Sequence, residues 1–123
     1  MNESIRPSKV CQNAISLIEV GWCTKSLMKF INGKTHHCLY SAIHNAAHTP
    51  RNPGRDVSKR ISETTEQVIS SVAQEIGEGG NQDAGNRIGL WNDRQRDKRA
   101  VIRMLEKVKA GFEATEVTSD EAD

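Results

Sequence analysis

Four histidines lie between residues 36 and 48, and they are the first place to look for metal chemistry. On one helix, at about 100° per residue, His37, His44 and His48 would share a sector opposite the apolar side. His37 and His48 would still lie about 16 Å apart along the axis, so one ion cannot bind all three. Only His44 and His48 could chelate together, and Asn-Ala-Ala between them lacks the Glu of an HExxH site. We therefore predict a solvated polar face, with no metal and no cofactor.

Three cysteines, Cys11, Cys23 and Cys38, raise the question of thiol chemistry. Cys38 is expected at a helix start, where the helix dipole lowers the pKa of a thiol. A thiol nucleophile also needs a base, and the histidines later in this helix project from its other side. No CxxC pair supports zinc binding. The sequence favours a small buried thiol beside Ala42 and predicts no catalytic residue.

The tripeptide Trp91-Asn92-Asp93 precedes the last predicted helix and could be a structural corner. Asp97 is a suitable N-cap for a helix that begins at Lys98. Asn92 and Asp93 can accept hydrogen bonds from turn or cap amides, and Trp91 can fill core space in a chain with few aromatic residues. The alternative is a small pocket lined by Trp22, Cys38, Trp91, Asn92 and Asp93.

Charge is segregated along the chain, although the formal net charge is only +1. Residues 94–109 contain seven Lys or Arg and two acids, whereas residues 113–123 contain five acids and no base. The basic helix could contact nucleic-acid phosphates or a protein partner, and no helix-turn-helix pattern decides between them. The candidate partner-binding residues are Arg94, Arg96, Lys98, Arg99, Arg103 and Lys107.

Four amphipathic helices are needed to position these side chains. The first is capped at Ser8 and stops at Gly21, and the last begins at Lys98. Ile88 and Leu90 are expected in a short extended segment before it. The fold class is therefore predicted to be mainly α, a compact bundle of about four helices. The predicted helices are residues 8–20, 36–48, about 57–76 and 98–112.

Residues 22–37 have two interpretations. Asn32-Gly33 is a strong hairpin turn, which favours an extended arm or short hairpin. A short helix capped at Thr24 and ended by the same Asn-Gly is the alternative. Phe30 and Ile31 would be exposed in an arm and could support a dimer.

The length of 123 residues suits one domain with a modest aliphatic core, since 36% of residues are hydrophobic and 4% aromatic. We expect a disordered N-terminus at residues 1–7, a single helical domain at 8–113 and an acidic disordered tail at 114–123. No run of about 18 apolar residues and no signal-peptide core occur. Three unpaired cysteines are typical of a reducing cytoplasm.

Three short motifs follow one another in a particular order: Gly-Trp-Cys at 21–23, Cys-Leu-Tyr-Ser-Ala-Ile at 38–43 and Trp-Asn-Asp-Arg at 91–94. In this order they resemble a family of small bacterial and bacteriophage proteins of unknown function. The chain departs from that pattern at Ser41, where members usually carry Gly, and in the basic segment after Trp-Asn-Asp. The resemblance implies a prokaryotic, often phage, setting and a mainly helical fold, and it transfers no catalytic residue.

The function expected from these observations is binding without catalysis. The chain would be a cytoplasmic accessory protein, acting in the host cytoplasm if phage-encoded, that binds a host protein or protein complex. Inhibition of a host defence or regulatory complex is one such role. Two alternatives stay open: a nucleic-acid-associated module that uses the basic helix, and a ligand-binding or thiol enzyme domain around Cys38. No membrane partner is expected.

Overall fold

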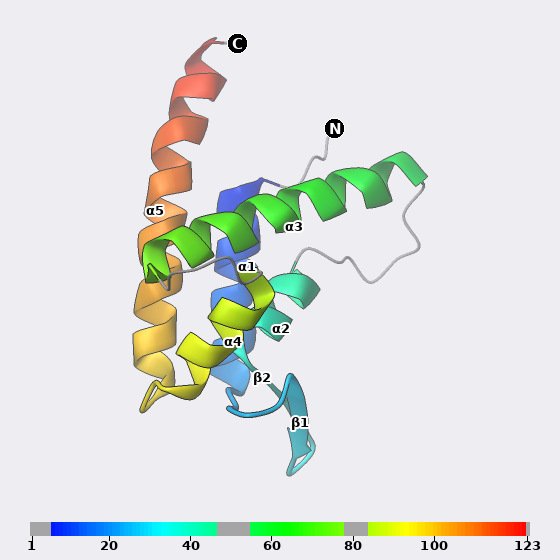
Figure 1. The fold of residues 1–123 in the computed structure, drawn as a ribbon. Helices are drawn as coiled ribbons and strands as arrows, with labels where there is room; N and C mark the ends of the chain where they lie inside the picture. Colours follow the sequence, from blue (N-terminus) through cyan, green and yellow to red (C-terminus); the bar gives the residue numbers. More distant parts are fainter. Residues whose placement is uncertain (1–5, 47–54, 78–83, 123) are drawn as a thin grey trace.

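Five helices and a two-stranded hairpin make up the part of the chain that the computed structural model describes, residues 6–46, 55–77 and 84–122 (Figure 1). The mainly helical class is confirmed, with one helix more than expected. In chain order the elements are α1 (Pro7–Val20), β1 (Met28–Ile31), β2 (Lys34–His37), α2 (Leu39–Ala46), α3 (Arg55–Ile76), α4 (Ala84–Asp93) and α5 (Lys98–Ala122).

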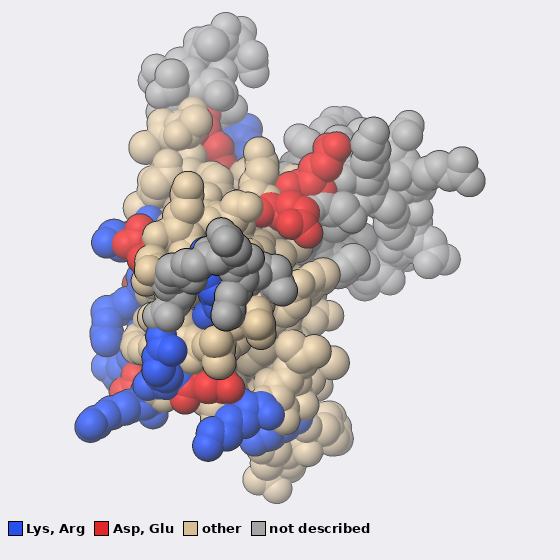
Figure 2. All heavy atoms as spheres, viewed as in Figure 1, with Lys and Arg blue, Asp and Glu red and all other residues tan. Residues whose placement is uncertain are grey.

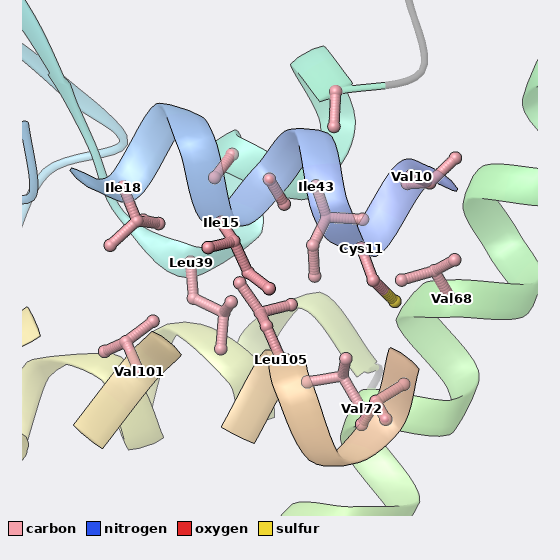
Figure 3. Packing of buried hydrophobic residues seen from close by; sticks show 14 of the residues in the cluster. Val10, Cys11, Ile15, Ile18, Leu39, Ile43, Val68, Val72, Val101 and Leu105 are labelled. Atoms are coloured by element: carbon pink, nitrogen blue, oxygen red, sulfur yellow. The ribbon is translucent and has the colours of Figure 1, made fainter. Parts of the chain in front are cut away.

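The core lies between α1, α2, α3 and α5, whose apolar faces meet as the helical spacing predicts (Figure 3). Ile18 of α1, Ile43 of α2 and Leu105 of α5 are each 0% exposed. Removing such a side chain from water contributes about 1.5–3 kcal/mol to the free energy of folding. α1 packs most extensively against α5 and next against α2. The other elements pack around these two contacts.

The hairpin confirms the extended interpretation of residues 22–37. Asn32 and Gly33 both have positive φ, 52° and 78°, as the tight turn requires. The antiparallel pairs run from Ile31 opposite Lys34 to Met28 opposite His37. In Figure 1 the hairpin projects from the end of the molecule opposite the C-terminal end of α5. Only the end of the hairpin nearest the helices therefore lies close to the core.

Gly21 joins α1 to the hairpin and allows a close approach of two segments. A Cβ at this position would lie 2.8 Å from the His36 ring and 2.8 Å from the Thr35 carbonyl oxygen. The backbone at residues 21–23 runs beside β2, since the His37 amide donates to the Gly21 carbonyl and the Cys23 amide donates to the His37 carbonyl, both at 3.0 Å. The predicted helix stop at Gly21 is confirmed.

Three predicted helix details are wrong. Residues 88–91 belong to α4 and are not extended, because a helix places Ile88 and Asn92, four residues apart, on one buried side. α2 begins at Leu39, so His37 lies in β2 and the three histidines do not share a helix. α1 begins at Pro7 after an Arg6 N-cap, and not at a Ser8 cap.

The two ends of the described chain are linked through Ser8 in α1 and Glu116 in α5. Ser8 contacts Glu116 of α5, which accepts hydrogen bonds from the Ser8 amide and hydroxyl. α5 extends to Ala122, and the expected disorder of the N-terminus at residues 1–7 and of the acidic tail at residues 114–123 stays a prediction. Residues 1–5 lie outside the described residues.

Candidate functional site

Asn92 connects several residues of the predicted pocket, and it is 0% exposed. Its Oδ1 accepts hydrogen bonds from the indole Nε1 of Trp22 at 2.7 Å and from the amide of Leu39 at 3.1 Å. Its Nδ2 donates to the carbonyl of Cys23 at 3.1 Å. One amide thus joins the end of α4, the start of α2 and the segment after α1. We call these four residues the Asn92 corner.

Asp93 extends the Asn92 corner toward the surface. Its Oδ1 accepts a hydrogen bond from the amide of Lys25 at 2.7 Å, and the Nδ2 of Asn92 lies 3.5 Å from the same oxygen. Lys25 has φ of 64°, a region that L-residues rarely adopt. Asp93 therefore stabilises an unfavourable backbone turn before the hairpin.

The five residues of the predicted pocket are only partly brought together. Trp22, Asn92 and Asp93 are linked through the bonds above, and Cys38 precedes Leu39 at the same helix start. Trp91 is half-buried and packs against the core, while its carbonyl oxygen accepts a hydrogen bond from the amide of Arg94. Because Oδ1 accepts two hydrogen bonds and Nδ2 donates to the Cys23 carbonyl, the Asn92 amide holds these elements together.

Cys38 is buried, with 4% of its surface exposed, as the sequence predicts. The amide of Ser41 lies 3.4 Å from its Sγ and favours the thiolate. Burial outweighs this effect and raises the pKa of Cys38, so the expected lowering by the helix dipole does not decide its charge state. Burial also raises the pKa of Cys23, and that of Cys11 to about 12. All three are thiols at neutral pH.

The histidines separate into different environments. His37 is buried and its Nδ1 lies 2.9 Å from the hydroxyl of Ser41; burial lowers its pKa. His44 is exposed, with its Nε2 3.1 Å from the hydroxyl of Tyr40. His48, the partner of the predicted i, i+4 pair, lies outside the described residues. No group of three His, Cys, Asp or Glu side chains within the described ranges could hold a metal ion.

The basic residues of α5 have divided roles. Lys98 donates to the carbonyl of Glu19 at 2.8 Å, at the end of α1, and Lys107 forms an ion pair with Glu75 of α3. The side chains of Lys98, Arg99 and Arg103 border an open groove that Glu19 also lines. Figure 2 shows Lys and Arg side chains gathered along the side of the molecule where α5 begins. The other predicted partner-binding residues, Arg94 and Arg96, are exposed just before α5.

Exposed hydrophobic residues are grouped in β1 and at Leu27 just before it, and the sequence indicated this group only through Phe30 and Ile31. Leu27 is 61% exposed, Met28 53%, Phe30 74% and Ile31 43%. No Asp or Glu occurs between Glu19 and Asp56. We define the hairpin surface as these four apolar residues with the exposed lysines Lys25, Lys29 and Lys34. The signal in the sequence was an apolar tetrapeptide interrupted by one Lys and followed by a hairpin turn.

A model of a protein family of unknown function matches residues 2–110 of the chain. Neither the curated proteins nor the solved structures provide a match. Within the described residues, none of the helices has the length and apolar content needed to cross a membrane.

Proposed function

The chain belongs to this family, DUF6197, and we propose that it is a non-enzymatic binding protein that contacts another protein through the hairpin surface. The observation that carries the proposal is the exposure of Leu27, Met28, Phe30 and Ile31 on one projecting hairpin. Several exposed apolar side chains gathered in one segment are typical of an interaction site. Aromatic residues and Met are enriched in such sites.

The contacts made by the polar side chains and the Cys38 thiol support binding over catalysis. Asn92 and Asp93 hold backbone and indole groups in place, and Cys38 is buried as a thiol. None of these groups faces a partner that would act as its base or nucleophile in the contacts described above. The finer proposal is an accessory protein of a prokaryote or phage that occludes a host protein, for instance in a defence or regulatory complex.

The basic surface near the start of α5 also supports a role in protein binding. Arg96, Arg99 and Arg103 are exposed and would attract an acidic partner over a distance set by the ionic strength. Contact through the apolar hairpin would then provide most of the affinity, because exposed charges contribute mainly to the rate of association.

The test is capture of partners from a bacterial lysate with tagged protein, comparing wild type with Phe30→Asp and Leu90→Asp. Leu90 is 50% exposed on α4 and provides a matched control outside the hairpin. We expect Phe30→Asp to reduce recovery of a stoichiometric partner by about tenfold or more, as loss of a buried aromatic contact does. Leu90→Asp should retain that partner. Both variants should melt near the wild-type temperature, because both positions are exposed.

Two results would contradict the proposal. Equal recovery by wild type and Phe30→Asp would show that the hairpin surface is not the contact. Recovery that disappears after nuclease treatment, and that reversal of charge at Arg99 and Arg103 abolishes, would instead assign binding to nucleic acid through α5.

A further inference from the structure

We propose that the free edge of β1 binds an extended segment of the partner as an added antiparallel strand, and that this segment alternates apolar and acidic residues. The inference rests on the proposed function, because it assumes that the hairpin surface binds a protein. It adds the geometry of binding and the chemistry of the sequence that is bound.

The hydrogen-bond pattern of the hairpin shows which backbone groups face outward. A two-residue turn makes Ile31 and Lys34 a hydrogen-bonded pair, and every second pair follows it. The hydrogen bond of 2.9 Å from the Cys38 amide to the Leu27 carbonyl fits the same alternation of hydrogen-bonded and non-hydrogen-bonded pairs. The amides and carbonyls of Met28 and Phe30 therefore point away from β2. Among the described elements, only β2 packs appreciably against β1, and all residues of β1 are exposed.

The two faces of the hairpin differ in chemistry. Met28 and Phe30 share one face, because side chains alternate along a strand. The other face carries Lys29 and Ile31, with Lys34 and His36 from β2 directly opposite them. An added strand would continue both faces. Residues opposite Met28 and Phe30 should be apolar, and the residue opposite Lys29 should be acidic.

The open edge argues against a lipid surface as the occupant. Insertion of the apolar face into a bilayer would bring the outward amides and carbonyls of Met28 and Phe30 into the hydrocarbon. Backbone groups in hydrocarbon must be hydrogen-bonded, and these would have no partner there. A protein strand pairs them directly, as in other cases of strand addition to a sheet edge.

A second copy of the chain is disfavoured by charge. Two β1 strands paired with Lys29 opposite its copy would bring like charges together, and such lysines on edge strands discourage self-pairing. In every other register the two hairpins still face each other with lysines and no acid, because residues 20–55 contain neither Asp nor Glu. An acidic partner has the complementary charge.

The experiment uses the full-length protein and a fluorescein-labelled peptide, Thr-Val-Glu-Val-Glu-Val-Thr, with a control peptide in which Lys replaces both glutamates. We expect fluorescence anisotropy to show about three- to fivefold tighter binding of the Glu peptide, and Lys29→Glu to reverse the preference. Hydrogen exchange should slow about tenfold at the amides of Met28 and Phe30 when peptide is at about ten times its Kd. The amides of Lys29 and Ile31, already paired with β2, should change little.

Several results would overturn strand addition. The peptide could fail to bind at concentrations up to about 1 mM, or it could bind without slowing exchange at the amides of Met28 and Phe30. Vesicles of phosphatidylcholine and phosphatidylglycerol could slow exchange at these amides where the peptide does not. Exchange there could also slow when the protein concentration alone is raised, which would indicate self-association. If Phe30→Asp still abolishes partner capture, these results would leave the hairpin surface as the binding site and reject only the added strand. Equal capture by Phe30→Asp would reject the proposed function itself.

Discussion

Asn92 joins three segments that are far apart in the sequence. Its partners Leu39, Cys23 and Trp22 lie 53, 69 and 70 positions away. By contrast, Asp97 accepts a hydrogen bond at 3.2 Å from the amide of Ala100, three residues later. The cap at Asp97 was predictable because both partners belong to one turn. The contacts of Asn92 were not, since no local pattern indicates which distant amide it caps.

We predict that Asn92→Leu lowers the free energy of unfolding by about 3 kcal/mol. The substitution is close in size but leaves the half-buried Trp22 indole, the buried Leu39 amide and the Cys23 carbonyl without their partner. Denaturation in urea followed by circular dichroism would measure the change. Gln95→Ala is the matched control, because it removes a single hydrogen bond, from Nε2 to the Trp91 carbonyl at 2.8 Å, and should cost about 1 kcal/mol. A loss no larger than that of the control would contradict the structural role of the Asn92 corner.

At the scale of elements, the helices with strong apolar periodicity and the Asn32-Gly33 hairpin followed from the sequence. α4 did not, because its only large fully buried apolar side chain is Ile88, and one buried position sets no helical period. Its helical form depends on the neighbours that Ile88 and Asn92 face. The position of the hairpin relative to α1 likewise depends on the close approach at Gly21.

The two glycines Gly21 and Gly89 should respond in opposite directions to substitution by alanine. Gly21→Ala places a Cβ against the His36 ring and the Thr35 carbonyl and should destabilise the fold by about 1–3 kcal/mol. Gly89→Ala meets nothing within 4 Å and removes a glycine from inside α4, so it should stabilise by about 0.5–1 kcal/mol. Thermal unfolding of both variants under one condition would test this pair. A Gly21→Ala protein as stable as wild type would show that residues 21 and 35–36 do not pack this closely.

At the scale of the whole molecule, the three cysteines are separate in the sequence but equally shielded. Cys11, Cys23 and Cys38 are 0%, 6% and 4% exposed and come from α1, the segment after it and the start of α2. Cys11 belongs to the core cluster, whereas the Cys23 thiol lies 3.5 Å from the carbonyl oxygens of Ser26 and His36 beside the hairpin. The sequence predicted a small buried thiol at Cys38, but only the fold shows that burial overrides the helix dipole in setting its pKa.

We predict that alkylation of all three cysteines by iodoacetamide requires opening of the fold. In the native protein at pH 8, labelling should be slower by about a thousandfold or more than in urea, because the thiols are buried and protonated. Peptide mapping by mass spectrometry after a short pulse would give the rate at each position. Rapid native labelling of Cys38, with Cys11 still protected, would contradict the buried thiol and restore a thiol site near the Asn92 corner.

The helical class, the apolar faces, the hairpin turn and the cap at Asp97 could be predicted from the sequence alone, because each depends on residues a few positions apart. The three-dimensional fold was needed to show that Asn92 joins α2, α4 and the segment after α1, that α4 is helical, and that the hairpin projects with Met28 and Phe30 exposed. Those features depend on which distant segments pack together. Exposure, which carries the proposed function, is a property of that packing and not of any local pattern.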